Sequence, residues 1–396
     1  MRILHIVGSI NPAAGGPTEA IRMIIRYRPP GYEAEVATLD SPDASFLGEF
    51  PFQVHALGNR KKSWYSPKLV PWILKNRDRF DGIIVHGLWE FTGLAALIAV
   101  AGHKPFLVFT HGMLDPYFKR RYPLKHVKKW IYWLLAQYWI LRAASRVMFT
   151  TELERDLATK TFWLWHWNPM VVSYGADPEL PEIDQLIPAF YERCAELNVD
   201  DEGRSYLLFL SRIHPKKGCD LLLRAFATVA PAHPKLHLIM AGPDATGMRK
   251  NLQPIVDQAG LAQRVHWPGM LKGDAKWGAF AVSDAFILPS HQENFGIAVA
   301  EALACGRPVL ISDQVNIAPE IEADGCGIVE PDTLEGTVHL LERWLALDPE
   351  EREAMQQQTK LTFVRRYDMR RNSALILRTF ERLRAQSPAP IIHEAN

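Results

Sequence analysis

The sequence has few cysteines and almost no net charge. Its 396 residues include only four cysteines, and these form neither a C-x-x-C pair nor a cluster with histidine: Cys194, Cys219, Cys305 and Cys326. This spacing argues against a zinc site or a disulfide framework, so we expect reduced thiols. The 45 basic residues nearly balance the 44 acidic ones. The overall charge therefore gives no reason to expect a nucleic acid partner.

Three further features are missing. The sequence has no Asp-x-Asp triplet and no His, Cys and carboxylate group with ligand spacing, so we expect chemistry without a metal or another cofactor. Residues 1–7 read directly as a strand and lack the pattern of a secretory signal, which predicts a cytoplasmic chain. The apolar run at residues 130–141 is too short to span a bilayer, which needs about 20 residues.

Short apolar runs alternate with helical patterns in both halves of the chain. This order predicts an α/β protein, and a chain of 396 residues is too long for one core. We therefore expect two doubly wound parallel sheets, each Rossmann-like. The predicted strands span residues 3–7, 35–39, 52–56, 82–86, 106–110, 146–150 and 170–173 in the first half, and 206–210, 236–241, 265–267, 285–289, 308–312 and 327–329 in the second.

A proline-rich stretch separates the two halves. It follows residues 172–177 and continues to Pro188. We expect a first domain over residues 1–176 and a second over 177–365. After Pro349 only helical pattern remains, and residues 366–396 are expected to form a last helix and tail.

Two glutamates stand eight residues apart after the predicted strand 285–289. Glu293 is expected in the loop that follows the strand, and Glu301 in the early turns of a helix that Gly296 opens and Gly306 ends. A strand, a short loop and a helix N-terminus form an anion site, because backbone N–H groups and the helix dipole favour phosphate there. The two carboxylates could accept hydrogen bonds from sugar hydroxyls of the same ligand.

The run from Glu293 to Val309 resembles the E-x7-E motif of retaining glycosyltransferases of family 4. That resemblance implies the GT-B fold, with two Rossmann-like domains facing across a cleft. It also implies that Glu293 contacts the donor sugar as a catalytic residue and that Glu301 contacts the nucleotide ribose. The intervening Asn294, Phe295 and Gly296 then belong to the donor loop. Asn294 departs from the family, since many relatives have glycine there.

A basic loop follows the predicted strand 206–210. Arg212 and Lys217 are fixed positive charges there, and such charges suit a leaving nucleotide diphosphate, on which negative charge accumulates as the glycosidic bond breaks. The family has an arginine and a lysine in this place. Taken alone, basic residues in a loop are usually solvated; the nearby glutamate pair favours the functional interpretation.

The first half offers candidates at the ends of three strands. Gly15 and Gly16 match a glycine-pair loop that in the family approaches the donor phosphate, although they could be simple turn residues. His86 and His111 end strands, where ligands bind in such sheets. The resemblance gives His111 a catalytic position at the donor sugar. His86 and Asp115 are weaker candidates for the acceptor side. Both histidines are expected to face the cleft, with a structural histidine as the alternative.

These features together predict a retaining, metal-independent hexosyltransferase. It would move a sugar from a nucleotide-diphosphate-sugar donor to an acceptor hydroxyl, in polysaccharide or glycolipid biosynthesis. A non-hydrolysing sugar-nucleotide epimerase, a phosphorylase-like enzyme with a pyridoxal lysine, and an inactive subunit of a glycan assembly complex remain alternatives. The sequence leaves open the donor base and sugar, the acceptor and its linkage, the pathway and the oligomeric state.

One basic and aromatic segment is not explained by the donor site. Residues 119–129 contain six Lys or Arg and no acid, residues 130–141 are the apolar run, and 161–167 add three tryptophans. Tryptophan, tyrosine and basic residues are favoured at a membrane interface. We therefore expect peripheral contact with an anionic membrane, where a lipid-linked acceptor would be available. The alternative is a helix buried against its sheet.

Overall fold

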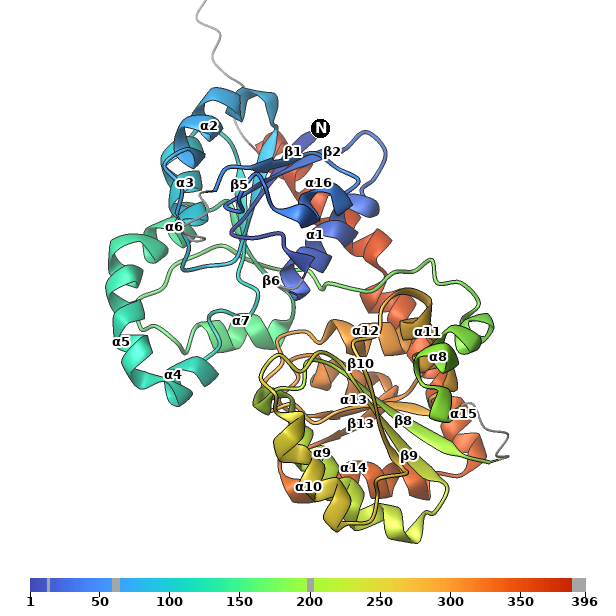
Figure 1. The fold of residues 1–396 in the computed structure, drawn as a ribbon. Coiled ribbons are helices and arrows are strands. Elements are labelled where there is room, and N and C mark those ends of the chain that lie inside the picture. Colours follow the sequence, from blue (N-terminus) through green and yellow to red (C-terminus); the bar gives the residue numbers. More distant parts are fainter. Residues whose placement is uncertain (13–14, 59–64, 198–202, 387–396) are drawn as a thin grey trace, which may run out of the picture. The chain divides into compact units, whose positions relative to one another are not determined.

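The structure is a computed structural model that describes the chain except for residues 13–14, 59–64, 198–202 and 387–396. It divides into two compact units, which we describe separately (Figure 1). The first unit combines Met1–Tyr174 with Met369–Asn396, and the second is Gly175–Asp368. From the sequence we expected the chain to divide after residues 176 and 365. In the structure it divides after residues 174 and 368.

The first unit contains a sheet of seven parallel strands in the order β3-β2-β1-β4-β5-β6-β7. All seven expected strands are present, so this part of the prediction is confirmed. Their ends shift by up to about two residues because propensity fixes strand centres better than strand ends. The strands are β1 (Arg2–Val7), β2 (Glu33–Thr38), β3 (Val54–Ala56), β4 (Gly82–His86), β5 (Phe106–Phe109), β6 (Arg146–Phe149) and β7 (Pro169–Val171).

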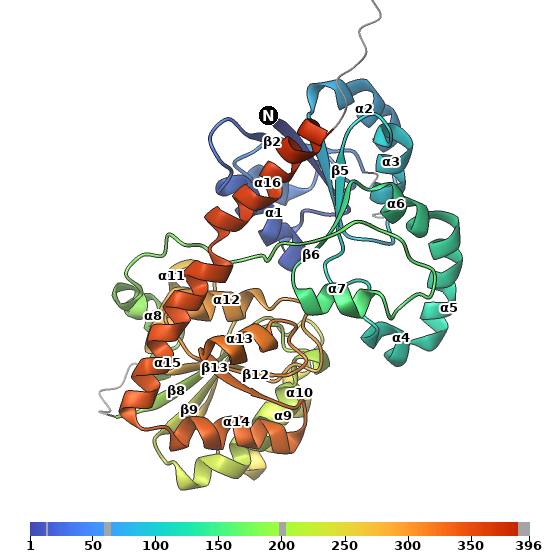
Figure 2. The same cartoon turned by 180° about the vertical axis from the view of Figure 1, so that it is seen from behind.

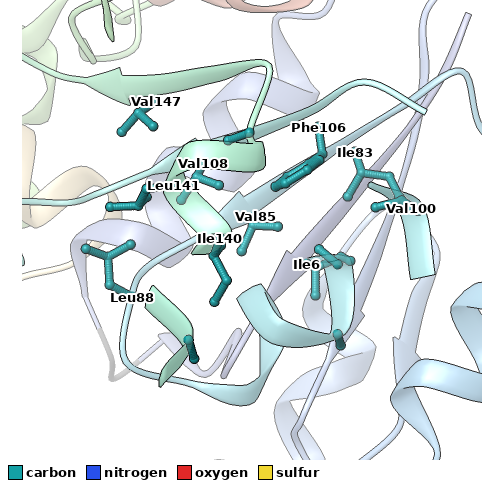
Figure 3. Packing of buried hydrophobic residues seen from close by; sticks show 14 of the residues in the cluster. Ile6, Ile83, Val85, Leu88, Val100, Phe106, Val108, Ile140, Leu141 and Val147 are labelled. Atoms are coloured by element: carbon teal, nitrogen blue, oxygen red, sulfur yellow. The ribbon is translucent and has the colours of Figure 1, made fainter. Parts of the chain in front are cut away.

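Apolar residues on these strands and on the helices beside them form the core of the first unit. Figure 3 shows Val85 and Val108 of neighbouring strands packed with Ile140. All three are fully buried, and each burial contributes about 1.5–3 kcal/mol. The helices are α1 (Gly16–Arg26), α2 (Leu69–Asn76), α3 (Phe91–Val100), α4 (Tyr117–Arg121), α5 (Pro123–Tyr132), α6 (Tyr138–Ala143), α7 (Glu152–Ala158) and α16 (Met369–Gln386).

The last helix, α16, belongs to the first unit, although it follows the second unit in the sequence (Figure 2). Ser373 donates a hydrogen bond from Oγ to the Ile24 carbonyl of α1, at 2.8 Å. The ring of Phe380 is fully buried against Gly82, where a Cβ atom would lie 2.3 Å from that ring. Glycine at the start of β4 therefore leaves the space in which α16 packs.

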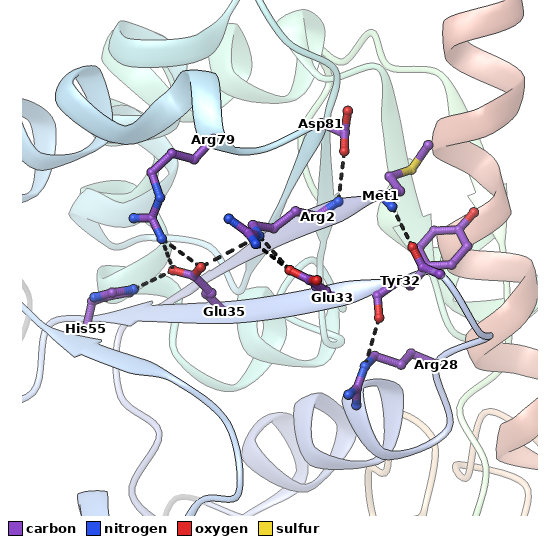
Figure 4. A network of polar contacts seen from close by, with 10 residues as sticks. Met1, Arg2, Arg28, Tyr32, Glu33, Glu35, His55, Arg79 and Asp81 are labelled. Atoms are coloured by element: carbon purple, nitrogen blue, oxygen red, sulfur yellow. Dashed lines mark hydrogen bonds and ion pairs between the residues drawn. The ribbon is translucent and has the colours of Figure 1, made fainter.

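A polar network covers the amino ends of β1 and β2 (Figure 4). Arg2 donates to Glu33 from Nε at 2.8 Å, and Glu35 accepts from Arg79 and from His55 at 2.8 and 2.7 Å. Arg2 and Glu33 are largely exposed, so their pair contributes little. The network lies at the edge opposite the one where ligands bind in such sheets, and we assign it a structural role.

The second unit contains six parallel strands in the order β10-β9-β8-β11-β12-β13. Each expected strand is again present. The strands are β8 (Ser205–Leu210), β9 (Leu236–Ala241), β10 (Val265–Gly269), β11 (Ala285–Leu288), β12 (Val309–Ser312) and β13 (Gly327–Glu330). The helices are α8 (Ile187–Arg193), α9 (Cys219–Val229), α10 (Arg249–Gln258), α11 (Gly273–Val282), α12 (Ile297–Ala304), α13 (Ala318–Asp324), α14 (Leu334–Ala346) and α15 (Pro349–Thr362).

All four cysteines are buried, and none of them forms a disulfide in the structure. Among the helices of the described residues, none is both long enough and apolar enough to cross a membrane.

A buried carboxylate holds α13 against the π-helical turn Phe363–Tyr367 that follows α15. Asp324 accepts from Arg366 at 2.7 and 2.9 Å, from Arg365 at 2.5 Å and from Thr362 at 3.1 Å. Its side chain is only 5% exposed. The hydrogen bonds from Arg366, with Arg365 and Thr362, lower the pKa of Asp324 to about 2.

We predict that Asp324→Asn lowers the free energy of unfolding of the second unit by about 1–3 kcal/mol at pH 7, because it leaves two guanidinium groups without their carboxylate. Urea unfolding measures the loss. Glu322→Gln, on an exposed site of the same helix, is the matched control and should stay within about 0.5 kcal/mol.

The difference between wild type and Asp324→Asn should also depend on pH. The folded pKa of Asp324 lies below the unfolded one, so its contribution is complete above about pH 4 and is lost as the pH falls toward 2. Equal stability of the two proteins at pH 7 would contradict the role assigned to this carboxylate.

Candidate functional site

The strand order of the second sheet locates a crevice. From β8 the chain moves outward to β9 and β10, and from β11 it moves in the other direction to β12 and β13. Neighbouring strands β8 and β11 are therefore the switch point, where ligands bind in open α/β sheets. Helices α9 and α12 follow these two strands, so two helix N-termini lie beside the same crevice and favour an anion there.

Glycines allow the loops at this crevice to approach one another. Gly218 has a φ of 65°, and a Cβ atom on it would lie 1.9 Å from the Pro289 carbonyl oxygen at the end of β11. Gly242, after β9, has a φ of 147°, and a Cβ atom there would lie 1.7 Å from the Ser211 carbonyl oxygen. Any side chain at either position would push the loops apart.

Lys217 and Glu293 form an ion pair across the switch point. Lys217 comes from the loop after β8 and Glu293 from the loop after β11, and Lys217 Nζ donates to Glu293 Oε2. The side chains are only 10% and 19% exposed. Two of the residues expected at the donor site are therefore in direct contact. Burial strengthens the attraction but also makes each charge depend on the other.

Glu301 pairs with a residue that the sequence did not indicate. Its Oε1 accepts a hydrogen bond from Lys276 Nζ at 2.8 Å, and the side chains are 12% and 21% exposed. Lys276 lies on α11, and its Nζ is 3.9 Å from the centroid of the Trp277 ring. Lys276 lies 25 residues before Glu301 and belongs to no sequence motif. Only the fold could therefore identify it as the partner of Glu301. Glu301 lies in the second turn of α12, as expected.

The rest of the donor loop is held in place by local contacts. Phe295 is buried, and its ring packs edge-on against that of Tyr367 with the two centroids 5.6 Å apart. Asn294 Oδ1 accepts from Asn316 at 3.4 Å. Gly296 has a φ of 76° and precedes α12 directly. These three residues therefore shape the loop on which Glu293 stands, and their expected contact with a donor stays a prediction.

Arg212 is less tightly fixed than Lys217. Its side chain is exposed, and among the described residues no hydrogen bond or ion pair joins it to Lys217, Glu293 or Glu301. Its charge still acts on the loop: burial first, then Arg212 and the neighbouring lysines, lower the pKa of His214. The structure thus leaves Arg212 at the crevice with its guanidinium in solvent.

The switch point of the first sheet lies between β1 and β4, and a chain of three histidines crosses it. His5 Nδ1 lies 2.9 Å from His86 Nε2, and His86 Nδ1 lies 3.2 Å from His111 Nε2. His111 Nδ1 lies 3.2 Å from the Tyr174 hydroxyl. Burial lowers the pKa of His5 and of His111 to about 3, so the rings are neutral.

This arrangement changes the expectation for the two candidate histidines. His86 is 1% exposed, so the prediction that it faces a cleft is wrong: burial puts it between His5 and His111. His111 is partly exposed and has a φ of 49°, which is strained for a residue with a side chain. Its role at a donor sugar stays a prediction.

A buried glutamate that the sequence did not indicate fixes the His111 loop. Glu154 Oε1 accepts from the Gly112 N–H at 2.7 Å and from the Thr110 hydroxyl at 2.6 Å. Its Oε2 accepts from the N–H and the hydroxyl of Thr150, both at 2.7 Å. Hydrogen bonds of this kind to a buried carboxylate are strong. They hold the loop after β5 against the end of β6.

The remaining candidates of the first unit have local roles in the structure. Gly15 precedes α1 with a φ of 86°, and Gly16 is the first helical residue; residues 13–14 of the same loop lie outside the described residues. Asp115 Oδ1 accepts from the N–H of Tyr117, the first residue of α4, at 2.7 Å. None of these contacts tests the predicted binding roles.

One hollow in the second unit does not coincide with these side chains. It measures about 530 Å³ and lies at the edge strand β10, where its lining includes Arg204, His237 and His266. These residues stand at the amino ends of their strands, opposite the edge where such sheets bind ligands. We therefore locate the site by the switch point and its paired charges. Among the described residues, no group of three or more His, Cys, Asp or Glu could hold a metal ion.

Two protein family descriptions match the chain. "Glycosyl transferase 4-like domain" matches residues 15–175, and "Glycosyl transferases group 1" matches residues 195–362. The first match falls in the first unit and the second match in the second unit.

Curated relatives match either a part or most of the chain. D-inositol 3-phosphate glycosyltransferase of Thermomonospora curvata is 39% identical over 165 residues, which are 36% of this chain and 37% of that protein. In the relatives of this name the match spans 34 to 56% of their length. GDP-mannose:cellobiosyl-diphosphopolyprenol alpha-mannosyltransferase of Xanthomonas campestris is 24% identical over 93% of this chain and 94% of its own.

Solved structures of similar fold match over nearly the whole chain. Sucrose-phosphate synthase of Thermosynechococcus elongatus has a TM-score of 0.75 at 18% identity and covers 98% of this chain and 100% of its own. Anabaena HepE in complex with UDP and glucose has a TM-score of 0.74 at 19% identity, covering 96% and 99%. Identities this low carry the fold and nothing more. The fold and the family descriptions agree, and the chain belongs to the glycosyl transferases group 1, with the two parallel sheets of a GT-B fold.

Proposed function

We propose that the protein is a retaining glycosyltransferase that moves a hexose-type sugar from a nucleotide diphosphate donor to an acceptor hydroxyl. The observation that carries this proposal is the Lys217–Glu293 pair at the switch point of the second sheet, beside the N-termini of α9 and α12. The relative from Xanthomonas campestris, named as a mannosyltransferase that uses GDP-mannose, matches over 93% of this chain and supports the same class of reaction.

Donor binding would redistribute the charges at the crevice. A diphosphate between two helix N-termini would compete with Glu293 for Lys217, since both offer oxygen acceptors to the same ammonium. Lys217, together with Arg212, would then stabilise the charge that develops on the leaving diphosphate. Glu293, released from Lys217, could accept a hydrogen bond from the donor sugar.

Glu301 would hold the nucleotide. A carboxylate in the second turn of α12 can accept hydrogen bonds from ribose hydroxyls, and the hydrogen bond from Lys276 holds it in position. We further propose that the reaction needs no metal, because fixed cations and helix N-termini can take over the role of a divalent ion at the diphosphate. The acceptor oxygen attacks the anomeric carbon on the face that the diphosphate leaves, the departing diphosphate takes the hydroxyl proton, and the configuration is retained.

The two glutamates should affect transfer in different ways. Glu301→Ala should mainly raise the KM for the donor through loss of a ribose contact, and Glu293→Ala should mainly lower kcat. Each effect should be about 1.5–3 kcal/mol, the range of a hydrogen bond to a charged group. Steady-state kinetics with a nucleotide-sugar and its product would measure both. Glu342→Ala, at an exposed position of α14, is the control, and near-normal kinetics in both site variants would reject the assignment.

The diphosphate contacts can be tested without an acceptor. Lys217→Ala and Arg212→Ala should weaken binding of the free nucleoside diphosphate by about tenfold or more, because the diphosphate is common to product and donor. Lys216→Ala removes the same charge one residue away and should have a much smaller effect. Titration calorimetry gives the constants. EDTA should leave transfer largely intact; loss of activity restored by manganese would overturn the metal-free mechanism.

The outer face of α5 and the helical turns after it supports a location at a membrane. Leu124, Val127, Ile131 and Leu135 are 82, 62, 61 and 76% exposed, at a spacing that puts them on one side of a helix. Trp163, in a separate segment, is 78% exposed. Residues 116–151 contain eight Lys or Arg and no Asp or Glu. Exposed apolar side chains among unneutralised cations fit an anionic bilayer surface.

We therefore propose that the first unit contacts the inner face of the plasma membrane, where a lipid-linked acceptor of glycolipid or polysaccharide synthesis is available. The alternative of a helix buried on all sides does not fit the exposed residues, although Trp133 and Ile140 of the same segment are fully buried. The segment thus has two apolar faces, one in the core and one in solvent.

Flotation with liposomes tests this contact. The protein should float with vesicles that contain anionic lipid, and the bound fraction should fall with salt and with Lys125→Glu plus Lys128→Glu. Leu124→Ser plus Ile131→Ser should reduce binding at low salt as well. Lys250→Glu plus Lys272→Glu, at exposed positions of the second unit, makes the same change in net charge and should float normally. A wild-type protein that stays with the pellet at low salt has no such contact.

A further inference from the structure

A small cavity lies on the inner side of α5, at the carboxyl edge of the first sheet. It measures about 60 Å³, enough for several water molecules, since one occupies roughly 10–15 Å³ by this measure. Its lining comes from the loops after β4 and β5, from α4 and α5, and from residues 161–162. The walls are mostly apolar and include Trp89, Phe118, Tyr122 and Phe162.

Three lysines also line this cavity: Lys119, Lys125 and Lys129. Lys129 is half-buried, and its Nζ lies 4.5 Å from the Trp89 ring centroid and 5.6 Å from that of Phe118. Burial lowers the pKa of Lys129. The carboxylate of Asp115 also lines the cavity, and in the described part of the chain no ion pair joins it or another carboxylate to these three ammonium groups. Aromatic faces compensate a buried cation only in part, so an anion at this position would be stabilised.

Two independent features point to the same place. His126 lines the cavity, is 9% exposed, and its Nε2 has no hydrogen-bond partner. Its ring lies 4.9 Å from that of Phe162. Trp89 has a φ of 70°, which is costly for a bulky side chain and is found mainly at sites where the surrounding structure enforces it for a function.

We propose that this cavity binds a phosphate group attached to an apolar chain. The lysines bind the phosphate oxygens, and His126 contributes a hydrogen bond. The aromatic walls cover the first carbons of the chain. If the proposed function holds, this group belongs to the acceptor, and the acceptor class becomes a phosphate-bearing amphiphile. The outer face of α5 is exposed and apolar, so one helix would contact the bilayer and the phosphate of a molecule embedded in it.

Titration calorimetry with octyl phosphate below its micelle concentration tests the cavity directly. The complete chain should bind octyl phosphate more tightly than inorganic phosphate or octanol, because only octyl phosphate uses both the cations and the walls. Lys129→Met should weaken octyl phosphate binding by about tenfold, the effect of one charge-assisted hydrogen bond of about 1.4 kcal/mol. It should leave octanol binding unchanged or increased.

Lys128→Met is the matched control. Lys128 is the next residue on α5, carries the same charge, is exposed and does not line the cavity. It should change octyl phosphate binding by less than about twofold. Equal losses in the two variants would show attraction to the surface alone and would overturn the proposal, as would octyl phosphate binding no tighter than inorganic phosphate. His126→Phe, which keeps the ring but removes Nε2, should also weaken octyl phosphate more than octanol.

The binding test uses no donor and no turnover, so the two proposals fail separately. If octyl phosphate binds as described but no sugar is transferred from any nucleotide donor, the cavity stands and the transferase is wrong. If transfer occurs and the cavity does not bind octyl phosphate, the acceptor is of another class. The melting temperature of each variant should match wild type, which excludes loss of fold as the cause.

Discussion

Lys217 cannot remain charged and nearly buried without a counter-charge, and the second unit meets this need with Glu293. A buried ion pair contributes little net stability, since desolvation offsets much of the attraction, but removing one partner is costly. The pair is therefore poorly explained by stability alone. It needs β8 and β11 to be neighbours, and it needs Gly218 to let the Lys217 loop pass the end of β11. An anionic ligand fits such a site because it can replace Glu293 without leaving Lys217 unpaired.

Both units have a crevice created by their strand order, but the side chains at the two crevices differ in charge. Each sheet reverses its strand order between two central strands, so each opens a crevice at its carboxyl edge. The second unit puts charges there, with the pairs Lys217–Glu293 and Lys276–Glu301. The first unit puts neutral rings there. A charged crevice suits a diphosphate, whereas hydrogen-bonding rings that stay neutral suit uncharged hydroxyls.

Much of the fold and part of the site could be predicted from the sequence. Each strand is a short apolar run bounded by turn residues, so all thirteen were recognisable. Glu293, Glu301 and Lys217 lie in local patterns, and the fold brings the first and last of these into contact. Glu154, Lys276 and His5 could not be found in this way. Apart from Thr150, which is four residues from Glu154, the partners named above are 25 to 81 residues away along the chain, and a single Glu, Lys or His without a nearby pattern carries no sequence signal.

The misjudged burial of His86 has the same origin. A histidine that ends a strand can point to solvent or into the sheet, and neighbouring strands decide which. Here β1 and β5 flank β4, and each contributes a ring that packs against His86, with ring centroids 5.2 and 5.5 Å apart.

The exposure of the helical run 123–143 was difficult to predict for another reason. Periodicity alone could not show whether its second apolar face meets protein or water, and the exposed Leu124 and Ile131 resolve this.

The histidine chain also fixes the direction of its hydrogen bonds. His5 Nε2 is buried without a partner, and a bare acceptor nitrogen there costs less than an N–H without an acceptor. If Nε2 is bare, the proton of His5 is on Nδ1 and is donated to His86 Nε2. His86 must then donate from Nδ1 to His111, and His111 from Nδ1 to the Tyr174 oxygen. The burial of His5 thus decides the protonation state of a ring two strands away. A hydroxyl that displaced Tyr174 would meet His111 as a hydrogen-bond donor, at every pH where the chain stays neutral.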